Sequence, residues 1–287
     1  MKKIINNVLI LLAIVCICAC CDIIHGPYKV TPTPPDTTSA GDTIRRVLLE
    51  DFTGIYCGYC PDGHREAKKI TDRYGDKVVL IGIHANPDIF TKPRETTDPD
   101  FRTNWGKEID NFYSVSISGL PRGLVNRMSW KNSITVGYRD WFAAVDSFLK
   151  LPLEASILVN NTYDTASRNL KIDIEINPKI VLPPTTQLVV QLTEDSIVAI
   201  QLDYNGIADP PFENPNYIHK HVFRKGINGT FGEKLSATAS PANVKVTKSY
   251  NLTVDPSWNA NECEIVAYLF DQQTNEVRQV TQKKIHP

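Results

Sequence analysis

Two cysteines separated by two residues are the part of this chain whose spacing most directly indicates chemistry. Cys57 and Cys60 follow an apolar, strand-like run that ends near Phe52, and they open a stretch with helical character. Residues three apart share a helix face, so the two thiols can close a disulfide without large backbone movement. At the first turn, free N–H groups and the helix dipole favour a thiolate at Cys57. The pair predicts thiol–disulfide exchange, with Cys57 as nucleophile and Cys60 as resolving thiol.

Other uses of the pair compete with redox chemistry. A structural disulfide here would close a very short loop and stabilise the fold by only about 2 kcal/mol. Covalent haem needs a histidine directly after the second cysteine, where Pro61 stands. Zinc could use the two thiols with His64 and His84, yet the second paired-ligand motif of structural zinc sites is missing. We expect neither a metal nor a cofactor.

The N-terminus indicates export. Two lysines precede the apolar stretch 8–17, which is too short for a convincing membrane-spanning helix, and this combination predicts a signal peptide over residues 1–19. The segment Ile17–Cys20 resembles a bacterial lipobox, so Cys20 is the expected lipid anchor and Cys21 the alternative. Export delivers the protein to a compartment in which disulfides persist.

The length and composition of the chain are typical of a globular protein. The chain has 287 residues, of which 42% are hydrophobic and 22% charged, so it can form one large domain or two small ones, and we expect two. The formal net charge of -1 argues against nucleic acid or an anionic membrane surface as an electrostatic partner. Residues 20–43, rich in proline and threonine, are expected to form the lipid anchor and a flexible tether.

Residues 44–151 alternate between strand and helix patterns, which predicts a layered α/β domain. The apolar runs and helical spacings predict three strands and three helices. The strands are expected at 46–52, 77–84 and 123–126, and the helices at 57–74, around 101–112 and at 138–150.

Residues 152–287 change to a period of two, which predicts an all-β domain. Roughly six or seven short strands in this length suit an immunoglobulin-like β-sandwich, although a barrel has the same signature. Cys263 lies in one such stretch and is expected to be a small buried residue without a chemical role. The clearest strands are expected at 156–159, 170–176, 188–192, 244–254 and 264–270.

Residues 46–150 resemble a thioredoxin-fold domain. An acidic residue, Asp51, stands six positions before Cys57, and an aromatic residue, Tyr56, directly precedes it, as in that family. Further along, Pro121 lies in a loop that resembles the one in which thioredoxin-like proteins carry a cis-proline before a strand.

This resemblance implies roles for the surrounding residues. Asp51, buried beneath the pair, would carry the proton to and from Cys60, and the alternative is a strand-end residue that caps a turn. Pro121 would lie against the cysteines, and Leu120 before it would offer its backbone to an extended substrate peptide. Tyr56 would take part in substrate binding.

Three short motifs occur along the chain at Thr53-Gly54, Gly123–Arg127 and Tyr217–Arg224, with a glycine-containing stretch at 226–232. With these motifs the whole chain resembles the lipoprotein family related to a twenty-eight-kilodalton outer-membrane protein of Gram-negative anaerobes. The resemblance implies a lipid-anchored outer-membrane protein whose partners are protein thiols or disulfides in the periplasm or at the cell surface. The alternative is a surface binding or adhesion lipoprotein in which the disulfide is structural or vestigial.

Overall fold

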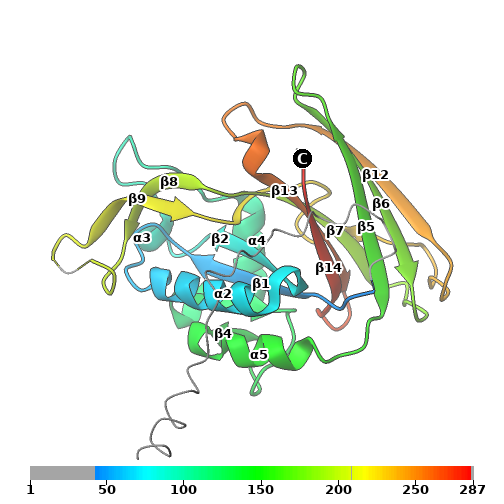
Figure 1. Ribbon diagram of the computed structural model, residues 1–287. Helices are drawn as coiled ribbons and strands as arrows, with labels where there is room; N and C mark the ends of the chain where they lie inside the picture. The colour runs from blue at the N-terminus through cyan, green and yellow to red at the C-terminus, as the bar shows by residue number, and fades with distance from the viewer. Residues whose placement is uncertain (1–42, 208, 286–287) are drawn as a thin grey trace, which may run out of the picture. The chain divides into compact units, whose positions relative to one another are not determined.

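The chain folds as a mixed α/β protein in which strands predominate (Figure 1). The structure, a computed structural model, describes residues 43–207 and 209–285, which belong to one compact unit. The expected signal peptide and the anchor Cys20 therefore lie outside the described residues. Each helix in the described part is too short or too polar to cross a membrane.

Four strands form the sheet of the first half. β1 and β2 are parallel neighbours, as an apolar strand, a helix and a second apolar strand predict, and β3 runs antiparallel on the other side of β1 with β4 beyond it. Every residue of β1 and β2 is buried, because helices cover both faces of the sheet. These strands are β1 (Val47–Thr53), β2 (Val78–His84), β3 (Arg122–Val125) and β4 (Thr135–Gly137).

Alternate residues of β1 face different helices. Val47 and Leu49 pack in one cluster with α2 and α5, whereas Leu48 packs in another with Ile109 of α4. The helix predicted from residue 57 begins only at Cys60, because residues 54–58 form turns and Pro61 occupies the first helical turn. The helices are α2 (Cys60–Tyr74), α3 (Asp88–Thr91), α4 (Asn104–Tyr113) and α5 (Trp141–Phe148).

The second half contains two facing sheets with an apolar cluster between them. In β6 the residues Leu170, Ile172, Ile174 and Ile176 are buried and alternate with more exposed ones, as the period of two predicts. The outer sheet has the order β12-β6-β5, and β7, β13 and β14 contribute to the larger sheet. These strands are β5 (Ala155–Tyr163), β6 (Asn169–Pro178), β7 (Thr186–Glu194), β12 (Val246–Thr253), β13 (Cys263–Asp271) and β14 (Val277–Lys284), and the short β11 (Glu233–Lys234) pairs with β7.

One sheet runs through both halves. β10 (Val222–Gly226) pairs antiparallel with β7 and parallel with β2, where Val222 lies opposite Gly82. The resulting order is β14-β13-β7-β10-β2-β1-β3-β4. The sequence did not reveal β10, because it joins the sheet only through partners far away along the chain.

A separate hairpin, also missing from the sequence predictions, leaves the second half and lies over the loop that carries the cysteines. It consists of β8 (Ile197–Leu202) and β9 (Glu213–His219), which pair antiparallel. The register shifts between Ala199 and Gln201, so a bulge divides the hairpin into a base and a tip. We call the described residues 201–207 and 209–213 the tip, and the paired segments 197–199 and 217–219 the base.

Candidate functional site

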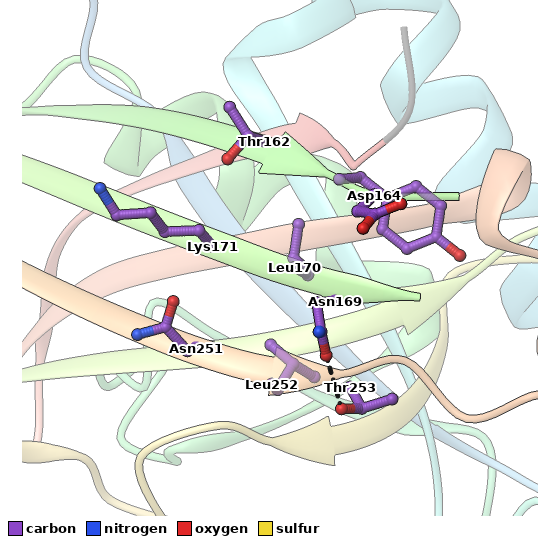
Figure 2. Close-up of a pocket in the computed structure, with 9 residues that line it drawn as sticks. Thr162, Asp164, Asn169, Leu170, Lys171, Asn251, Leu252 and Thr253 are labelled. Atoms are coloured by element: carbon purple, nitrogen blue, oxygen red, sulfur yellow. Dashed lines mark hydrogen bonds between the residues drawn. The ribbon is translucent and has the colours of Figure 1, made fainter. Parts of the chain in front are cut away.

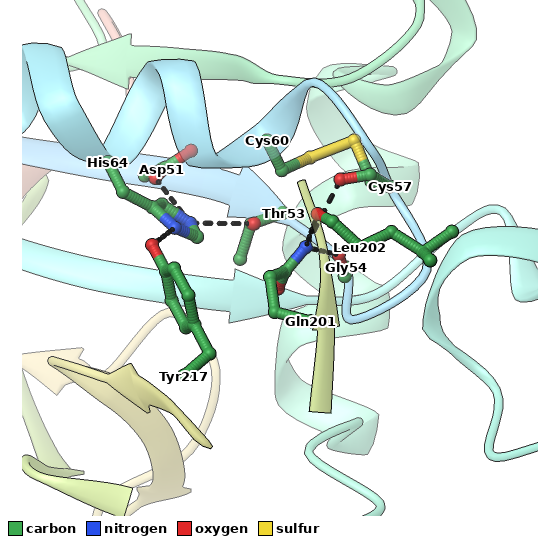
Figure 3. The surroundings of a disulfide bond; sticks show 9 residues. All are labelled: Asp51, Thr53, Gly54, Cys57, Cys60, His64, Gln201, Leu202 and Tyr217. Carbon is green, nitrogen blue, oxygen red and sulfur yellow. Dashed lines mark hydrogen bonds and ion pairs between the residues drawn. A yellow bond between two sulfur atoms is a disulfide. The ribbon is translucent and has the colours of Figure 1, made fainter. Parts of the chain in front are cut away.

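The two predicted cysteines form a disulfide at the point where β1 leads into α2 (Figure 3). Their Cα atoms are 5.3 Å apart. The Cys57 N–H donates to the Gly54 carbonyl at 3.0 Å, and the Cys60 N–H donates to the Cys57 carbonyl at 3.1 Å. Cys57 thus sits in a turn just before the helix rather than in its first turn, which corrects the sequence prediction. Cys57 is only 3% exposed and Cys60 is fully buried.

The hairpin tip covers this turn through backbone and amide hydrogen bonds. The Gln201 side-chain amide donates to the carbonyls of Gly54 and Cys57, each at 3.1 Å. The Leu202 N–H donates to the Ile55 carbonyl at 2.8 Å. The tip therefore binds the cysteine turn as an extended segment, and Figure 3 shows Gln201 and Leu202 lying beside it.

Side chains on α2 hold the same tip from a second side. The Arg65 guanidinium pairs with Asp203 at 2.9 Å. Asn205 donates to the Asp62 carboxylate at 2.7 Å. These contacts involve the first two turns of the helix, so the tip is attached both to the cysteine turn and to the helix that follows it.

Gly58, between the cysteines, allows the closest approach of the tip. The Tyr204 N–H donates to the Gly58 carbonyl at 2.9 Å, and a Cβ atom at position 58 would overlap the Tyr204 ring. The Tyr204 ring also meets Tyr59 edge to face, with centroids 5.2 Å apart. Only glycine fits at position 58 while the tip is in place.

Asp51 lies on β1 and is 6% exposed. Its Oδ1 has no hydrogen-bond partner, and its Oδ2 lies 3.5 Å from Nε2 of His64. Burial raises the pKa of Asp51 to about 8, since desolvation penalises the charged form. A carboxyl group with such a pKa can take up and release a proton near neutral pH.

His64 links β1 to the hairpin base. It follows Cys60 by four residues on α2, its Nε2 lies 2.9 Å from the Thr53 hydroxyl, and its Nδ1 lies 2.6 Å from the Tyr217 hydroxyl of β9. Burial lowers the pKa of His64 to about 3, so the ring is neutral at physiological pH. The sequence raised His64 only as a zinc ligand and quoted Tyr217 only as part of a family motif.

A cavity of about 560 Å³ separates α2 from β9, and Asp51, His64 and Tyr217 all line it. His84, at the end of β2, also lines it, is 3% exposed, and has no hydrogen-bond partner at either ring nitrogen. Burial lowers the pKa of His84 well below its usual value. No group of three or more histidine, cysteine or acidic side chains in the described residues is arranged to hold a metal ion.

The predicted proline loop reaches α2. The Leu120–Pro121 peptide bond is cis, as the family resemblance implied. A Cβ atom at Gly63 of α2 would lie 3.0 Å from Cβ of Pro121, so the missing side chain at Gly63 lets the proline approach the helix. Leu120 is half-buried and packs against an apolar cluster that includes β1. The strand β3 then starts at Arg122 and pairs with β1.

Tyr56 and Cys263 both lie in the interior. Tyr56 is 4% exposed, its hydroxyl donates to Asp98, and the Arg94 guanidinium lies 3.8 Å from the centre of its ring. Its role in substrate binding stays a prediction. Cys263 is a free, fully buried thiol at the start of β13, and burial raises its pKa to about 12.

A second cavity, of about 660 Å³, lies on the sheet formed by β5, β6 and β12 (Figure 2). Its lining is mostly polar and includes Asn169, Lys171 and Asn251, all exposed. It shares no lining residue with the cavity beside the disulfide. Of these two cavities, the one beside the disulfide is lined by buried titratable groups, namely Asp51, His84 and His219.

Comparison with known proteins gives one family and several similar folds. The family profile described as outer membrane protein Omp28 matches residues 107–287. HBP35 of Porphyromonas gingivalis is similar in structure, with a TM-score of 0.65 and 18% identity over 85% of this chain and 76% of that one. No curated protein matches the chain.

Two further solved structures show weaker similarity. Protein AGR_C_4864 from Agrobacterium tumefaciens has a TM-score of 0.50 at 11% identity, over 85% of this chain and 96% of that one. A domain of the outer membrane lipoprotein Omp28 from Porphyromonas gingivalis is 22% identical over 47% of this chain and 89% of that one, with a TM-score of 0.32. At these identities HBP35 and the Agrobacterium protein support the fold alone, and the score of the third is too low for an argument.

Proposed function

This chain belongs to the Omp28 family of outer membrane proteins, and from that premise we propose that it exchanges disulfides with proteins outside the cytoplasm. Its location is the outer membrane. We further propose that Cys20 carries the lipid that holds it there and that residues 20–43 form the tether. The dithiol Cys57/Cys60 is the proposed reactive group.

The arrangement around the disulfide favours a thioredoxin-like domain. A parallel strand pair, a helix directly after the cysteine turn, and a proline loop that leads into an antiparallel strand are the parts such a domain requires. β10 supplies the strand on the far side of β2. For the second half, two facing sheets with an apolar cluster between them favour the immunoglobulin-like sandwich.

The observation that carries the proposal is the buried carboxyl group of Asp51 near the disulfide. A disulfide that closes so short a loop contributes about 2 kcal/mol. A buried polar group without a full set of partners costs about 1 to 3 kcal/mol, which offsets that gain. A purely structural disulfide gains nothing from such a neighbour, whereas exchange chemistry needs a group that moves protons near neutral pH.

The proposed reaction with a disulfide-bonded partner has two steps. The Cys57 thiolate attacks one partner sulfur, forms a mixed disulfide and releases the other partner sulfur as a thiolate. Cys60 then gives its proton to ionised Asp51, attacks the Cys57 sulfur and closes the Cys57–Cys60 disulfide while the second partner thiolate leaves. The partner is reduced by two electrons and the dithiol is oxidised by two. The same steps in reverse oxidise a dithiol partner.

Access to Cys57 requires the hairpin tip to move. With the tip bound to the cysteine turn, only 3% of Cys57 is exposed, so an incoming protein sulfur must displace residues 201–204. The bulge between Ala199 and Gln201 offers a position at which the tip can bend away while the base stays paired. In the proposed cycle, the tip is displaced by the partner and returns after release.

Because the hairpin tip covers Cys57, the structure also favours a second candidate function. In this alternative the chain is a surface binding protein, and the disulfide only stabilises the turn that the hairpin contacts. Cys60→Ser separates the two, because a resolving-cysteine variant leaves a reactive dithiol protein linked to its partners. We expect the reduced variant, incubated with an oxidised periplasmic extract, to form mixed disulfides through Cys57 that mass spectrometry identifies. Cys57→Ser/Cys60→Ser is the matched control. If the single variant forms no more adducts than the control, the binding protein is the better account.

A further inference from the structure

His64 is held between the hairpin base and β1 by hydrogen bonds at both of its ring nitrogens. Nδ1 lies 2.6 Å from the Tyr217 hydroxyl, and Nε2 lies 2.9 Å from the Thr53 hydroxyl and 3.5 Å from Oδ2 of Asp51. Figure 3 shows the ring between Tyr217 and Asp51. The protein therefore fixes how this ring is oriented toward the one carboxyl group of the site.

The neighbours of His64 also bear on which nitrogen carries the proton. Burial raises the pKa of Tyr217, so its hydroxyl keeps its proton and is available to donate a hydrogen bond to Nδ1. The neutral ring then carries its own proton on Nε2, which faces Thr53 and Asp51. The opposite tautomer would direct the Nε2 lone pair at Asp51 and repel that carboxyl group when it is ionised.

We propose that Tyr217 and His64 are positioning residues that keep an N–H directed at Asp51 and so hold its carboxyl group ready to accept the proton of Cys60. The inference rests on the proposed function, because it concerns the second step of disulfide exchange. In that step the proton passes from the Cys60 sulfur to Asp51, and the new thiolate attacks the Cys57 sulfur of the mixed disulfide. The N–H at Nε2 stabilises Asp51 in the ionised form that accepts the proton.

The tip and the base of the hairpin have different roles. The tip covers the cysteine turn, whereas Tyr217 belongs to the base and pairs with Ala199. A tip that bends away at the bulge for an incoming partner leaves the bond between Tyr217 and His64 in place. His64 thus keeps its orientation toward the Asp51 carboxyl group while the mixed disulfide is present.

No other ionic partner competes for Asp51 among the described residues, since the only salt-bridge contact of that carboxyl group is to His64. Desolvation is the cause of its raised pKa. The electrostatic surroundings of His64 come from several elements. They are Asp51 on β1, Arg65 on α2, His84 on β2, Asp203 beyond β8, His219 on β9 and His221 beyond β9.

Tyr217→Phe tests the positioning role with the smallest change, because it removes one hydroxyl and keeps the ring. His64→Leu removes the donor, and His64→Gln restores an N–H that can face Asp51. Tyr74→Phe is the matched control, since it removes a tyrosine hydroxyl whose hydrogen bond goes to Asp146 and not to the hairpin or to His64. Two readouts are needed, namely the titration of the Asp51 carboxyl group and the rate of the second exchange step.

The Asp51 titration is measured in the oxidised protein by infrared difference spectroscopy, with Asp51→Asn to assign the band. We expect its midpoint to rise by about one pH unit in Tyr217→Phe and His64→Leu, and by less in His64→Gln. Tyr74→Phe should match the wild type. An unchanged or lowered midpoint in both Tyr217→Phe and His64→Leu overturns the inference, whether or not the dithiol exchanges.

The exchange step is measured with 5,5′-dithiobis(2-nitrobenzoate), whose second equivalent of thionitrobenzoate is released when Cys60 attacks the mixed disulfide at Cys57. At pH 7 we expect this release to slow by up to roughly tenfold in Tyr217→Phe and His64→Leu, with partial rescue in His64→Gln. An unchanged rate overturns the role in exchange. The proposed function itself is tested by a separate experiment, and it fails if the Cys60→Ser variant traps no partner proteins.

Discussion

At the scale of single residues, Asp51 is the group whose environment most needs a chemical explanation. It lies on a fully buried strand, and its only ionic contact in the described part of the chain is a neutral histidine at 3.5 Å. A protein selected only for stability would replace such a carboxyl group with an apolar side chain. The presence of a carboxyl group at this position is explained if its proton is transferred during disulfide exchange.

The raised pKa of Asp51 also predicts how the stability of the folded protein depends on pH. Because its pKa in the folded protein is raised to about 8, the folded state keeps a proton that the unfolded chain has lost at lower pH. The contribution of Asp51 to the free energy of unfolding is therefore fully present below its unfolded pKa and declines as pH rises toward 8. The half-buried His64 and the buried His219, both with lowered pKa values, act in the opposite sense below about pH 6.5.

We expect Asp51→Asn to abolish this decline. Relative to the wild type, the variant should gain roughly 1 to 2 kcal/mol of unfolding free energy between pH 6.5 and 8, measured by urea denaturation of the oxidised proteins. Asp76→Asn, at a largely exposed position, is the control and should follow the wild type. Parallel pH profiles for wild type and Asp51→Asn would contradict the assignment of a high pKa to Asp51.

At the scale of elements, the hairpin decides whether the disulfide can react. Its tip binds the cysteine turn through Gln201, Leu202 and Tyr204, and it binds α2 through Asp203 and Asn205. These are mostly hydrogen bonds and an ion pair rather than apolar packing, and an element held in this way opens at lower free-energy cost than a packed core does. The reactivity of Cys57 should therefore follow the stability of the tip contacts.

Gly58→Ala tests this dependence, because the added methyl group would overlap the Tyr204 ring and displace the tip. We expect dithiothreitol to reduce the disulfide of this variant faster than that of the wild type, by about tenfold if the tip contacts are weakened by about 1.4 kcal/mol. The rate is followed by alkylation and mass spectrometry.

Gly137→Ala is the matched control, since a Cβ atom there meets no neighbouring atom within 4 Å. Gln201→Ala, which removes the two amide hydrogen bonds without changing the residues between the cysteines, should accelerate reduction in the same direction. Equal reduction rates in the wild type, Gly58→Ala and Gln201→Ala would mean that the tip does not control access.

The elements near the cysteines were predictable from sequence, and the hairpin was not. β1, α2 and β2 follow one another along the chain, and their apolar spacing and the Cys57/Cys60 pair are local signals. β8 and β9 form a small separate sheet, and their contact with the cysteine turn joins residues far apart in the sequence. Tyr217 was quoted only within a family motif, because nothing near it in the sequence indicates that it meets His64.

At the scale of the whole molecule, the two halves share a sheet, and a buried ion pair of the first half is hydrogen-bonded to the second. Arg127, at the end of β3, binds Glu50 of β1 through two nitrogens at 2.6 and 2.8 Å, and both side chains are fully buried. The same guanidinium donates to the Tyr268 hydroxyl of β13 at 2.8 Å. The two halves predicted from sequence are thus joined through the interior as well as through β10.

Arg127→Met should therefore destabilise the whole protein. Removing the guanidinium leaves the Glu50 carboxylate buried without its partner, which typically costs about 3 to 5 kcal/mol. We expect a single urea transition, shifted to lower concentration and reported alike by fluorescence and circular dichroism. Glu50→Gln/Arg127→Met should recover part of the loss, and Lys131→Met, which removes an exposed ion pair with Asp140, should hardly change the midpoint. Two separate transitions in the wild type would contradict this account.

The reduction potential of the Cys57/Cys60 pair tests the central claim most directly. The full-length protein would be equilibrated in dithiothreitol redox buffers of known potential without denaturant, and the oxidised fraction read from the mass of alkylated protein. An exchange-active pair beneath a displaceable tip predicts full reversibility and a midpoint above about -300 mV. A midpoint well below that value, or reduction only after unfolding, would show that the disulfide is structural.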